Sequence, residues 1–527
     1  GMFNAMLSFY KKTLKAVLRH KYLTVVFMVV VLAVTGYLFV KIQKGFLPNQ
    51  DSNFLIGMTL GPESYSYEEM LENQRKVTEI VEKEPGVFAL MSAVGNFGVS
   101  NKGIMFVMMD DKSKRKLSAD AMVMDLWPKV NSVPGIFTFL QNPPPIQIGS
   151  ARTNAMYQYT LRSTNMQDLY KYGPIMTAKM TKIPGLVGVN NDLQINAPWI
   201  NVDIDRDKAA ALGLNVSQIQ TALGTAYGGM YASTIFSTID QYYVILQVEP
   251  QFRTQPNLLS RLYIRSSSDN RLIPLSTVAK ITESSGALTV NHTGMMPSTT
   301  ISFNLREGVS IGDAVSAITE IAHNELPPTL SGTFQGSAQA FQDSMSSMGP
   351  LMLITIFIIY MVLAILYESF IHPITILTSL PLAGFGALIT LVLFKMELNM
   401  YSFVGVVMLI GIVKKNGIMM VDFALELERE KGMESEESIY NACTVRFRPI
   451  MMTTMAALFG TIPIALGYGA GGDARQPLGI AVVGGLVFSQ MMTLYITPVF
   501  YIYMDRLNKW ITNRPKASSP ALENGGI

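Results

Sequence analysis

Long apolar stretches occur near the start of the chain and throughout its last third. A bilayer core about 30 Å thick is spanned by about 20 apolar residues in a helix. The sequence predicts six such spans, at 22–40, 348–368, 373–394, 400–424, 449–466 and 478–504. The first is too long for the apolar part of a signal peptide and lacks an A-x-A cleavage site, which favours a spanning helix. We therefore expect a multi-pass membrane protein with residues 41–347 between its first two spans.

Shorter patterns follow one another within residues 41–347. Strand-like and helix-like stretches lie at 53–60, 68–83, 86–94, 103–110, 118–131 and 135–141. Strand, helix, strand, strand, helix, strand is the split βαβ order of ferredoxin-like folds. Pro85-Gly86 and Pro134-Gly135 follow the two helical patterns, where a helix cannot continue. This order predicts a first ferredoxin-like subdomain over 41–150.

A second copy of the pattern begins after residue 150. Its predicted strands and helices lie at 157–162, 166–182, 186–191, 198–204, 299–304, 312–324 and 332–335. Several short strands and turns fill the gap. We therefore expect a second ferredoxin-like subdomain over 151–223 and 296–340, with a β-rich insertion over 224–295. Internal repeats are typical of transporters. An unrelated α+β domain with coincidental Pro-Gly turns is the alternative.

Basic residues orient the spans. Those flanking the first and the last span are Lys11, Lys12, Lys15, Arg19, Lys21, Arg506, Lys509, Arg514 and Lys516. The positive-inside rule places both ends of the chain in the cytoplasm and residues 41–347 outside. Residues 1–21 are predicted to form a basic amphipathic helix on the cytoplasmic membrane surface. We also expect a cytoplasmic helix at 425–448 and a cytoplasmic tail at 505–527.

Composition agrees with a membrane protein and excludes several other classes. Charged residues make up 15% of the chain, compared with about 25% in soluble proteins. The net charge of +3 gives no indication of nucleic-acid binding. Cys443 is the only cysteine, so an intramolecular disulfide and a cysteine-based metal site are excluded. We find no Walker motif for ATP, and no metal or Ser-His-Asp constellation accompanies the four histidines.

Two adjacent lysines, Lys414 and Lys415, lie inside the fourth predicted span. A lysine at the centre of a spanning helix costs about 2.5–3.5 kcal/mol on insertion scales. Extension of the side chain to the membrane edge is the structural alternative, but it accommodates both lysines poorly. A buried ammonium requires a carboxylate, and no Asp or Glu occupies the middle of any predicted span. We therefore expect Lys415 to be functional and its acid partner to come from another half or subunit.

Four motifs occur in order at matching positions: 46–48 (FLP), 366–370 (LYESF), 411–416 (GIVKKN) and 446–454 (RFRPIMMTT). With them the chain resembles, over residues 8–512, the resistance–nodulation–division (RND) multidrug efflux pumps. The forms VKKN and 475–480 (RQPLGI) are most similar to the branch whose pumps assemble from two different subunits. A complete RND chain contains two such halves, has twelve spans and forms a trimer. This chain resembles the second half only.

The resemblance implies roles for residues of the spans. Lys415 resembles the relay lysine that pairs with an aspartate pair on the fourth span of the first half, and no such pair is present here. Thr453 resembles the relay threonine, Arg446 the arginine at the cytoplasmic proton exit, and Asn416 is implied to pack beside the lysine. Without the resemblance, the better interpretation is that the hydroxyl of Thr453 donates to a carbonyl of its own helix.

The resemblance also implies a drug-contact surface in the first subdomain. The aromatic residues at matching positions are Phe88, Phe97, Phe106, Phe137 and Phe139. Phe97 lies in 94–102, the counterpart of the family's switch loop, although this loop differs from the family pattern in length and content. Taken alone, each of these phenylalanines is more often a core residue than a ligand contact.

The expected function is efflux of amphiphilic drugs or bile-salt-like compounds from the periplasm and outer leaflet by an inner-membrane pump component of a Gram-negative bacterium. The proton-motive force drives it, without a cofactor. The resemblance implies a periplasmic porter region, a docking role for the 224–295 insertion, a periplasmic adaptor protein, an outer-membrane channel and a partner half or subunit with the aspartate pair. The alternative is a non-transporting half-pump that binds amphiphiles or assists assembly. A metal-ion exporter is disfavoured, because no Met or carboxylate cluster has metal-ligand spacing.

Overall fold

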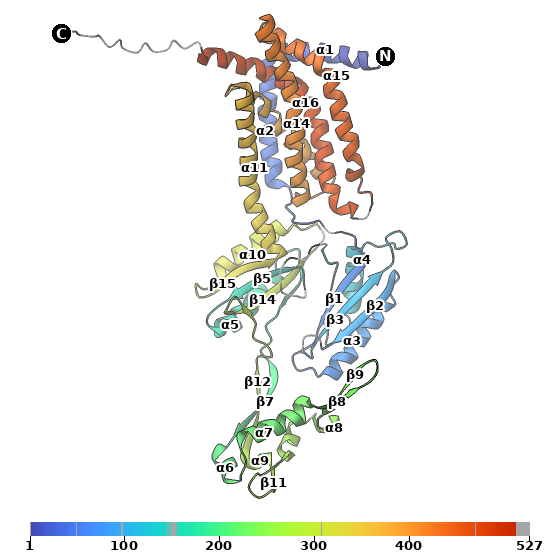
Figure 1. The fold of residues 1–527 in the computed structure, drawn as a ribbon, viewed down its shortest axis with the longest axis vertical. Coiled ribbons are helices and arrows are strands. Elements are labelled where there is room, and N and C mark those ends of the chain that lie inside the picture. Colours follow the sequence, from blue (N-terminus) through green and yellow to red (C-terminus); the bar gives the residue numbers. More distant parts are fainter. Residues whose placement is uncertain are drawn as a thin grey trace, which may run out of the picture.

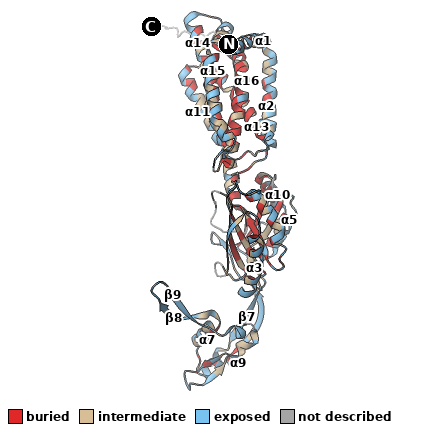
Figure 2. Cartoon of the chain, turned by 90° about the vertical axis from the view of Figure 1, so that its right-hand side faces the viewer, coloured by how far each residue is buried: buried red, intermediate tan, exposed pale blue. Residues whose placement is uncertain are grey.

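Three tiers of structure lie along the long axis of the molecule: a helical bundle, a pair of sheet units side by side, and a distal insertion (Figure 1). The computed structural model describes residues 2–48, 50–95, 99–144, 146, 148, 155–253, 255–306, 308–469 and 471–512. Buried residues concentrate in the bundle and the sheet units, whereas the distal insertion is mostly exposed (Figure 2).

Eight helices form the described part of the bundle: α1 (Met2–Arg19), α2 (Lys21–Lys41), α11 (Ser337–Tyr367), α12 (His372–Leu377), α13 (Leu380–Leu393), α14 (Met400–Lys431), α15 (Ser435–Ala465) and α16 (Gly472–Thr512). With α12 and α13 taken together, six helices among the described residues are long and apolar enough to cross a membrane. Helix α16 is central and packs against α12, α13, α14 and α15. Its apolar segment is 67% buried, whereas those of α2 and α11 are 11% buried.

The span predicted over 373–394 corresponds to His372–Leu393, which is apolar enough to cross a membrane, but a turn divides it into α12 and α13. Pro381 has no N–H to donate to the carbonyl of Leu377, which is the bond that a continuous helix requires there. The separate cytoplasmic helix expected over 425–448 is absent, because α14 continues to Lys431 and α15 begins at Ser435. Gly432 ends α14 with a φ of 63°, a left-handed conformation that favours glycine.

The first sheet unit follows α2. It contains β1 (Phe54–Leu60), α3 (Tyr67–Glu82), β2 (Val87–Val94), β3 (Lys102–Met109), α4 (Ala119–Val130) and β4 (Phe137–Gln141). The strands pair antiparallel in the order β2-β3-β1-β4. Alternate residues such as Leu55, Met105 and Leu140 are buried together with Met70, Val77 and Met122 of the two helices. Both helices therefore cover the same face, and the other face of the sheet carries no helix of this unit.

The second sheet unit repeats this arrangement. It contains β5 (Tyr157–Arg162), α5 (Met166–Thr181), β6 (Leu186–Asn191), β14 (Met296–Leu305), α10 (Ile311–Glu325) and β15 (Ser331–Gly336). Its strands pair in the order β6-β14-β5-β15, and the short β13 (His292–Thr293) pairs with the start of β14. β6 and β14 thus occupy the places of β2 and β3. The chain enters the bundle directly from β15, because α11 begins at Ser337.

The insertion begins earlier than expected. The predicted strand 198–204 is β7 (Ala197–Ile204), which does not join the second sheet but pairs with β12 (Ala279–Gly286) in a two-stranded ribbon. Most of β7 is exposed, and its alternating pattern does not specify which strand it pairs with. Residues before 224, such as Leu214 and Ile219, pack with Ile264 and Leu275 in the core of the insertion. The boundary expected at residue 224 is therefore too late.

Ten short elements complete the distal insertion between β7 and β12. They are α6 (Arg206–Ala211), α7 (Val216–Leu223), η2 (Gly224–Gly229), β8 (Met230–Phe236), β9 (Gln241–Leu246), α8 (Pro250–Arg253), η3 (Pro256–Arg261), β10 (Tyr263–Arg265), β11 (Leu272–Pro274) and α9 (Leu275–Val278). Strands β8 and β9 form an antiparallel hairpin whose side chains are almost all exposed. Figure 1 shows this hairpin projecting from the insertion toward the side of the first sheet unit.

Candidate functional site

Helix α14 has a buried face and an exposed face. Its exposed residues Val404, Met408, Gly411, Lys415, Asp422 and Glu426 recur at helical spacing. We name these six residues the α14 stripe. Lys415 lies near the midpoint of the helix, whereas Lys414 is half-buried and Asn416 is buried. Successive residues of a helix point about 100° apart, so the burial of Asn416 is consistent with an outward-facing Lys415.

Lys415 has no acidic partner within the described part of the chain, where none of the ion pairs includes it. Asp422 and Glu426 lie two to three turns further toward the end of the helix. One turn before the lysine, a Cβ added to Gly411 would meet no atom within 4 Å. Small residues allow close approach of another helix. The α14 stripe therefore has the charge and the shape of a surface that receives a further helix.

Three buried polar side chains join α14, α15 and α16 directly behind this stripe. They are Asn416, Thr454 and Gln490, which are 5%, 4% and 6% exposed. The Asn416 Nδ2 group donates to Gln490 Oε1 at 3.0 Å and to Thr454 Oγ1 at 3.2 Å. Thr454 Oγ1 in turn donates to Gln490 Oε1 at 2.6 Å. We name these three residues the polar clamp. Each of its members bonds to another in the buried interior of the bundle, where an unpaired polar group is costly.

Close helix packing surrounds the polar clamp. A Cβ added to Gly405 of α14 would lie 3.0 Å from the carbonyl oxygen of Leu478 in α16, and one added to Gly386 of α13 would lie 2.7 Å from that of Gly484. Glycines thus allow α13 and α14 to approach the backbone of α16. The position of α14 is therefore fixed by backbone contact near the start of the helix and by the polar clamp near its middle.

Among the described residues, no hydrogen bond or ion pair joins Thr453 or Arg446 to Lys415. Thr453 is half-buried, and its hydroxyl donates to the carbonyl of Ile450 at 3.2 Å, a bond within its own helix. The guanidinium of Arg446 lies over the ring of Phe423 at 4.6 Å. Its Nε atom is buried and has no hydrogen-bond partner among the described residues. The relay roles of Lys415, Thr453, Arg446 and Asn416 stay predictions.

The first sheet unit places three of the predicted aromatic residues on one face. Phe106 lies opposite Ile56 of β1, Phe139 opposite Met58 and Phe137 opposite Leu60. These β1 residues alternate with Leu55, which faces the helices, so the three phenylalanines lie on the face without helices. Phe137 is exposed and Phe106 is half-buried.

Phe139 on this face and the other two predicted aromatic residues, Phe88 and Phe97, differ in their surroundings. Phe139 is buried and packs edge-on against Trp127 at 6.2 Å. A Cβ added to Gly188 of β6 would lie 3.6 Å from the ring of Phe139, so this ring contacts the second sheet unit. Phe88 is exposed at a register shift between β2 and β3. Phe97 lies outside the described residues. Drug contact by these residues stays a prediction.

A cluster of charges connects the first sheet unit to the bundle. Lys112 donates to Asp473, in the first turn of α16, at 2.6 Å and lies 3.7 Å from Asp51. Asp51 also accepts from Arg115 Nη2 at 2.6 Å and from the Ala119 N–H at 2.8 Å. Burial alone would raise the pKa of Asp51, but the Ala119 N–H and the Arg115 guanidinium outweigh this effect, so its pKa is lowered. We name these five residues the first joint.

Backbone hydrogen bonds connect the second sheet unit to the bundle. The Leu398 N–H donates to Gln43 O at 2.8 Å, the Met400 N–H to Phe46 O at 3.0 Å, and the Gly312 N–H of α10 to Lys44 O at 3.4 Å. The segment after α2 thus lies between the start of α14 and the start of α10. We name residues 43–46, 397–400 and 312 the second joint. Burial raises the pKa of Glu397 in this joint, and Asp313 raises it further.

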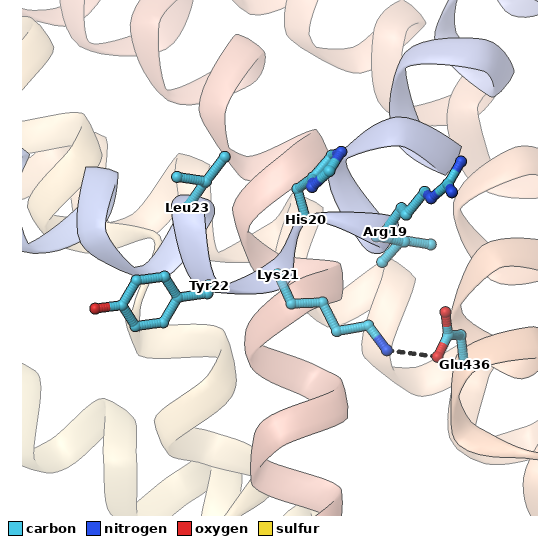
Figure 3. A pocket seen from close by; sticks show the side chains of 7 residues that line it. Arg19, His20, Lys21, Tyr22, Leu23 and Glu436 are labelled. Carbon is cyan, nitrogen blue, oxygen red and sulfur yellow. Dashed lines mark hydrogen bonds and ion pairs between the residues drawn. The ribbon is translucent and has the colours of Figure 1, made fainter.

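An open hollow of about 570 Å³ lies at the bend between α1 and α2 (Figure 3). Arg19, His20, Lys21 and Tyr22 line it, and Lys21 pairs with Glu436 of α15 at 2.5 Å. Helix α1 itself packs against the bundle: Tyr10 stacks on Phe447 at 4.6 Å, and its hydroxyl donates to Leu494 O at 2.9 Å. The hollow is remote from the polar clamp, and the pair Lys21–Glu436 ties α2 to α15.

Sequence reasoning did not identify Thr454 and Gln490. The signal for Gln490 was available, because an amide within the span predicted at 478–504 requires a partner in hydrocarbon. Thr454 is adjacent to Thr453 in the motif 446–454, and the motif does not indicate which hydroxyl faces the bundle. Among the described residues, no group of three His, Cys, Asp or Glu side chains is arranged to hold a metal ion.

Comparisons with known proteins agree on one family. The sequence profile of the AcrB/AcrD/AcrF family matches residues 1–505. The "Multidrug resistance protein MdtC" of Escherichia coli strain K12 / DH10B is 40% identical over 508 residues, which cover 96% of this chain and 49% of MdtC. MdtC of Escherichia fergusonii has the same identity and coverage. The chain therefore spans about half the length of these relatives.

Solved structures show the same fold. Two crystal forms of a heavy metal efflux pump superpose with TM-scores of 0.85 and 0.84, at 21% and 22% sequence identity. Each superposition covers 96% of this chain and 53% or 52% of the pump chain. The sequence matches confirm the predicted resemblance to RND efflux transporters, and the chain belongs to the AcrB/AcrD/AcrF family.

Proposed function

We propose that this chain is the second half of an inner-membrane RND pump that exports amphiphilic drugs or bile-salt-like compounds and is driven by inward proton flow. Six helices then cross the inner membrane of a Gram-negative bacterium, with both sheet units in the periplasm. The position of Lys415 carries this proposal: it is exposed near the middle of α14, without an acid partner among the described residues. The name of the MdtC relatives, multidrug resistance protein, supports multidrug export.

In this proposal Lys415 pairs with acidic residues supplied by a first half or a partner subunit across the α14 stripe. Protonation of those acids releases the ammonium and changes the attraction between the two helical bundles. Thr453 and Arg446 would lie along the proton path on α15, with Arg446 toward the cytoplasmic end. Asn416 faces the interior of this chain and holds Lys415 in position through its hydrogen bonds to Thr454 and Gln490.

The two sheet units are the ferredoxin-like porter subdomains, and the distal insertion is the docking subdomain. A trimer of complete chains would contact a periplasmic adaptor and an outer-membrane channel through this insertion. Substrate would bind on the face of the first sheet unit without helices, where Phe106 and Phe137 lie, and Phe88 and Phe97 would extend this surface. Aromatic side chains suit varied amphiphiles because they offer large contact areas without strict hydrogen-bond geometry.

The test is a Lys415→Ala variant in the complete pump, in which this chain is co-expressed with a chain that carries the transmembrane aspartate pair. We expect proton-driven dye efflux from proteoliposomes to be lost, at least about 100-fold, since a lost charge partner in a dry site removes the coupling. Lys414→Ala is the matched control and should retain efflux, because Lys414 lies beside Lys415 but not on the α14 stripe.

Two results would contradict the proposal. Efflux by the Lys415→Ala pump at the rate of the wild type would exclude the relay role. Stable association of the two chains, with amphiphile binding but no proton flux in the wild type, would favour the alternative of a non-transporting half-pump that binds amphiphiles or assists assembly.

A further inference from the structure

The polar clamp fixes α14 by directional bonds next to Lys415. Apolar neighbours such as Val413 and Met420 are also buried, but apolar contacts tolerate small rotations of a helix. Hydrogen bonds between an amide, a hydroxyl and a second amide are lost when donor and acceptor separate or misalign. In hydrocarbon no water replaces them. The polar clamp therefore resists rotation of α14 relative to α15 and α16.

Gln490 is the centre of the polar clamp. Its Oε1 atom accepts two hydrogen bonds, one from Asn416 and one from Thr454. Its own Nε2 group lies 3.3 Å from Met451 Sδ, and a thioether is a weak acceptor. The contribution of Gln490 to the network therefore depends mainly on its carbonyl oxygen. A side chain of equal length without that oxygen would leave Asn416 and Thr454 bonded only to each other.

We infer that Gln490 and Thr454 are positioning residues: through Asn416 they hold the rotation of α14 so that Lys415 faces outward from this chain. The inference rests on the proposed function for its effect on transport, but not for its effect on structure. Neither residue titrates in the relevant pH range and neither touches the moving proton. Their effect is exerted through the direction of the Lys415 side chain, which lies about 100° around the helix from Asn416.

The first experiment measures the rotation of α14 directly and requires no transport. The single cysteine is replaced (Cys443→Ser), and a nitroxide is attached at Met408→Cys, an exposed position of the α14 stripe. Oxygen accessibility and mobility of the label are then measured by EPR in proteoliposomes. We expect Gln490→Met and Thr454→Val to change the oxygen accessibility by about two-fold or to split the spectrum into two components.

Matched variants separate positioning from general damage to the fold. Thr454→Ser retains the hydroxyl and should restore the wild-type spectrum. Ser489→Ala removes a buried hydroxyl of α16 that contacts Thr493 at 3.3 Å rather than the polar clamp, and it should leave the label unchanged. Wild-type spectra for both Gln490→Met and Thr454→Val would overturn the inference. So would equal changes in Thr454→Ser and Thr454→Val.

The second experiment uses the complete pump. Gln490→Met should lower kcat for dye efflux about ten-fold with little change in KM, and it should displace the pH profile, because a misdirected ammonium stabilises the partner carboxylates less. A lower kcat with an unchanged pH profile would indicate a merely structural role and contradict the inference. If the wild-type pump shows no proton-driven efflux, the proposed function fails, and the EPR result alone decides whether the polar clamp holds α14.

Discussion

Asp51 illustrates how a single residue of the first joint holds several segments together. It caps the N-terminus of α4 through the Ala119 N–H and pairs with Arg115, whose side chain is almost completely buried. Arg115 also donates to the carbonyls of Ser52, Asp110 and Leu117. A carboxylate with these partners is favoured in its charged form, and the lowered pKa of Asp51 reflects this.

The Asp51→Asn variant should destabilise the first sheet unit by about 3 kcal/mol at pH 7, because a buried guanidinium loses its counter-charge. The pH dependence has a definite sign. Since the folded-state pKa of Asp51 lies below the unfolded value of about 3.9, its contribution is present above that value and is lost as the pH falls through the folded pKa.

Thermal unfolding in detergent, followed by the fluorescence of Trp127 in α4, measures this effect. The unfolding temperature of the wild type should approach that of Asp51→Asn as the pH is lowered from 7 to 3. The exposed Glu72→Gln serves as a control that is expected to leave the unfolding temperature unchanged. A constant difference between wild type and Asp51→Asn across this pH range would contradict the assignment.

At the scale of single residues, the sequence predicted individual charges better than hydrogen-bond networks. Lys415 was predictable because a lysine in an apolar span is costly wherever it points. Asn416 was implied by the family resemblance, as the residue that packs beside that lysine. The choice between Thr453 and Thr454 depends on the rotation of α15, which is set by contacts with two other helices, and no local pattern contains that information.

Among the helices, α1 is the one whose packing into the bundle the sequence did not predict. It was expected on the membrane surface, and its residues Lys12, Lys15 and Arg19 are indeed exposed. Its opposite face, however, packs into the bundle through Tyr10, Leu14 and Leu18. The helix therefore contributes to the core formed by α14, α15 and α16.

Leu14→Ala should lower the free energy of unfolding by about 2–5 kcal/mol, because Leu14 is fully buried and its removal leaves a cavity. Thermal melting of the purified chain in detergent measures the loss. Lys15→Ala is the matched control at the adjacent exposed position, where a change within about 0.5 kcal/mol is expected. Equal unfolding temperatures for the two variants would show that α1 is not part of the cooperative core.

Element types were predictable from periodicity, whereas partners and interruptions were not. The strand at 198–204 was identified, but its partner was not. β7 pairs with β12, which follows it in the chain by some 75 residues. The interruption between α12 and α13 could have been inferred from Pro381, since a proline inside an apolar run removes one hydrogen bond. Gly432 is a similar signal between α14 and α15.

Across the whole molecule, the two joints connect different spans to different sheet units. The first joint links the start of α16 to the first sheet unit, and the second links the start of α14 to the second sheet unit. Because the polar clamp holds α14 against α16, movement of this pair would reach both sheet units. The joints therefore give the bundle a direct route to the face where Phe106 and Phe137 lie.

Lys112→Glu places like charges beside Asp473 and Asp51 and should weaken the first joint. In the complete pump we expect dye efflux to fall at least about three-fold, with the proposed Lys415-dependent proton coupling still present. The double variant Lys112→Asp with Asp473→Lys restores opposite charges and should recover most of the activity. Unchanged efflux in the single variant would exclude a role of this ion pair in transport.

The division of the chain into membrane spans and repeated sheet units was predictable, because long apolar runs and repeated Pro-Gly turns are local signals. The repeated strand order could be traced in the sequence, because strand-like and helix-like patterns of apolar residues follow one another in the same order in each unit. The joints were not predictable, since Lys112 and Asp473 are separated by 361 residues and each resembles an ordinary surface charge. The boundary of the insertion was misplaced for the same reason: it is defined by packing between distant segments.

The uninterrupted passage from β15 into α11 has a mechanical consequence. With 31 residues, α11 is about 46 Å long, and no loop separates it from the sheet. It is therefore a lever joined directly to the second sheet unit. A tilt of about 10° at one end displaces the other by about 8 Å over that length. Pro350, which lies inside the helix, is the natural place for this lever to bend.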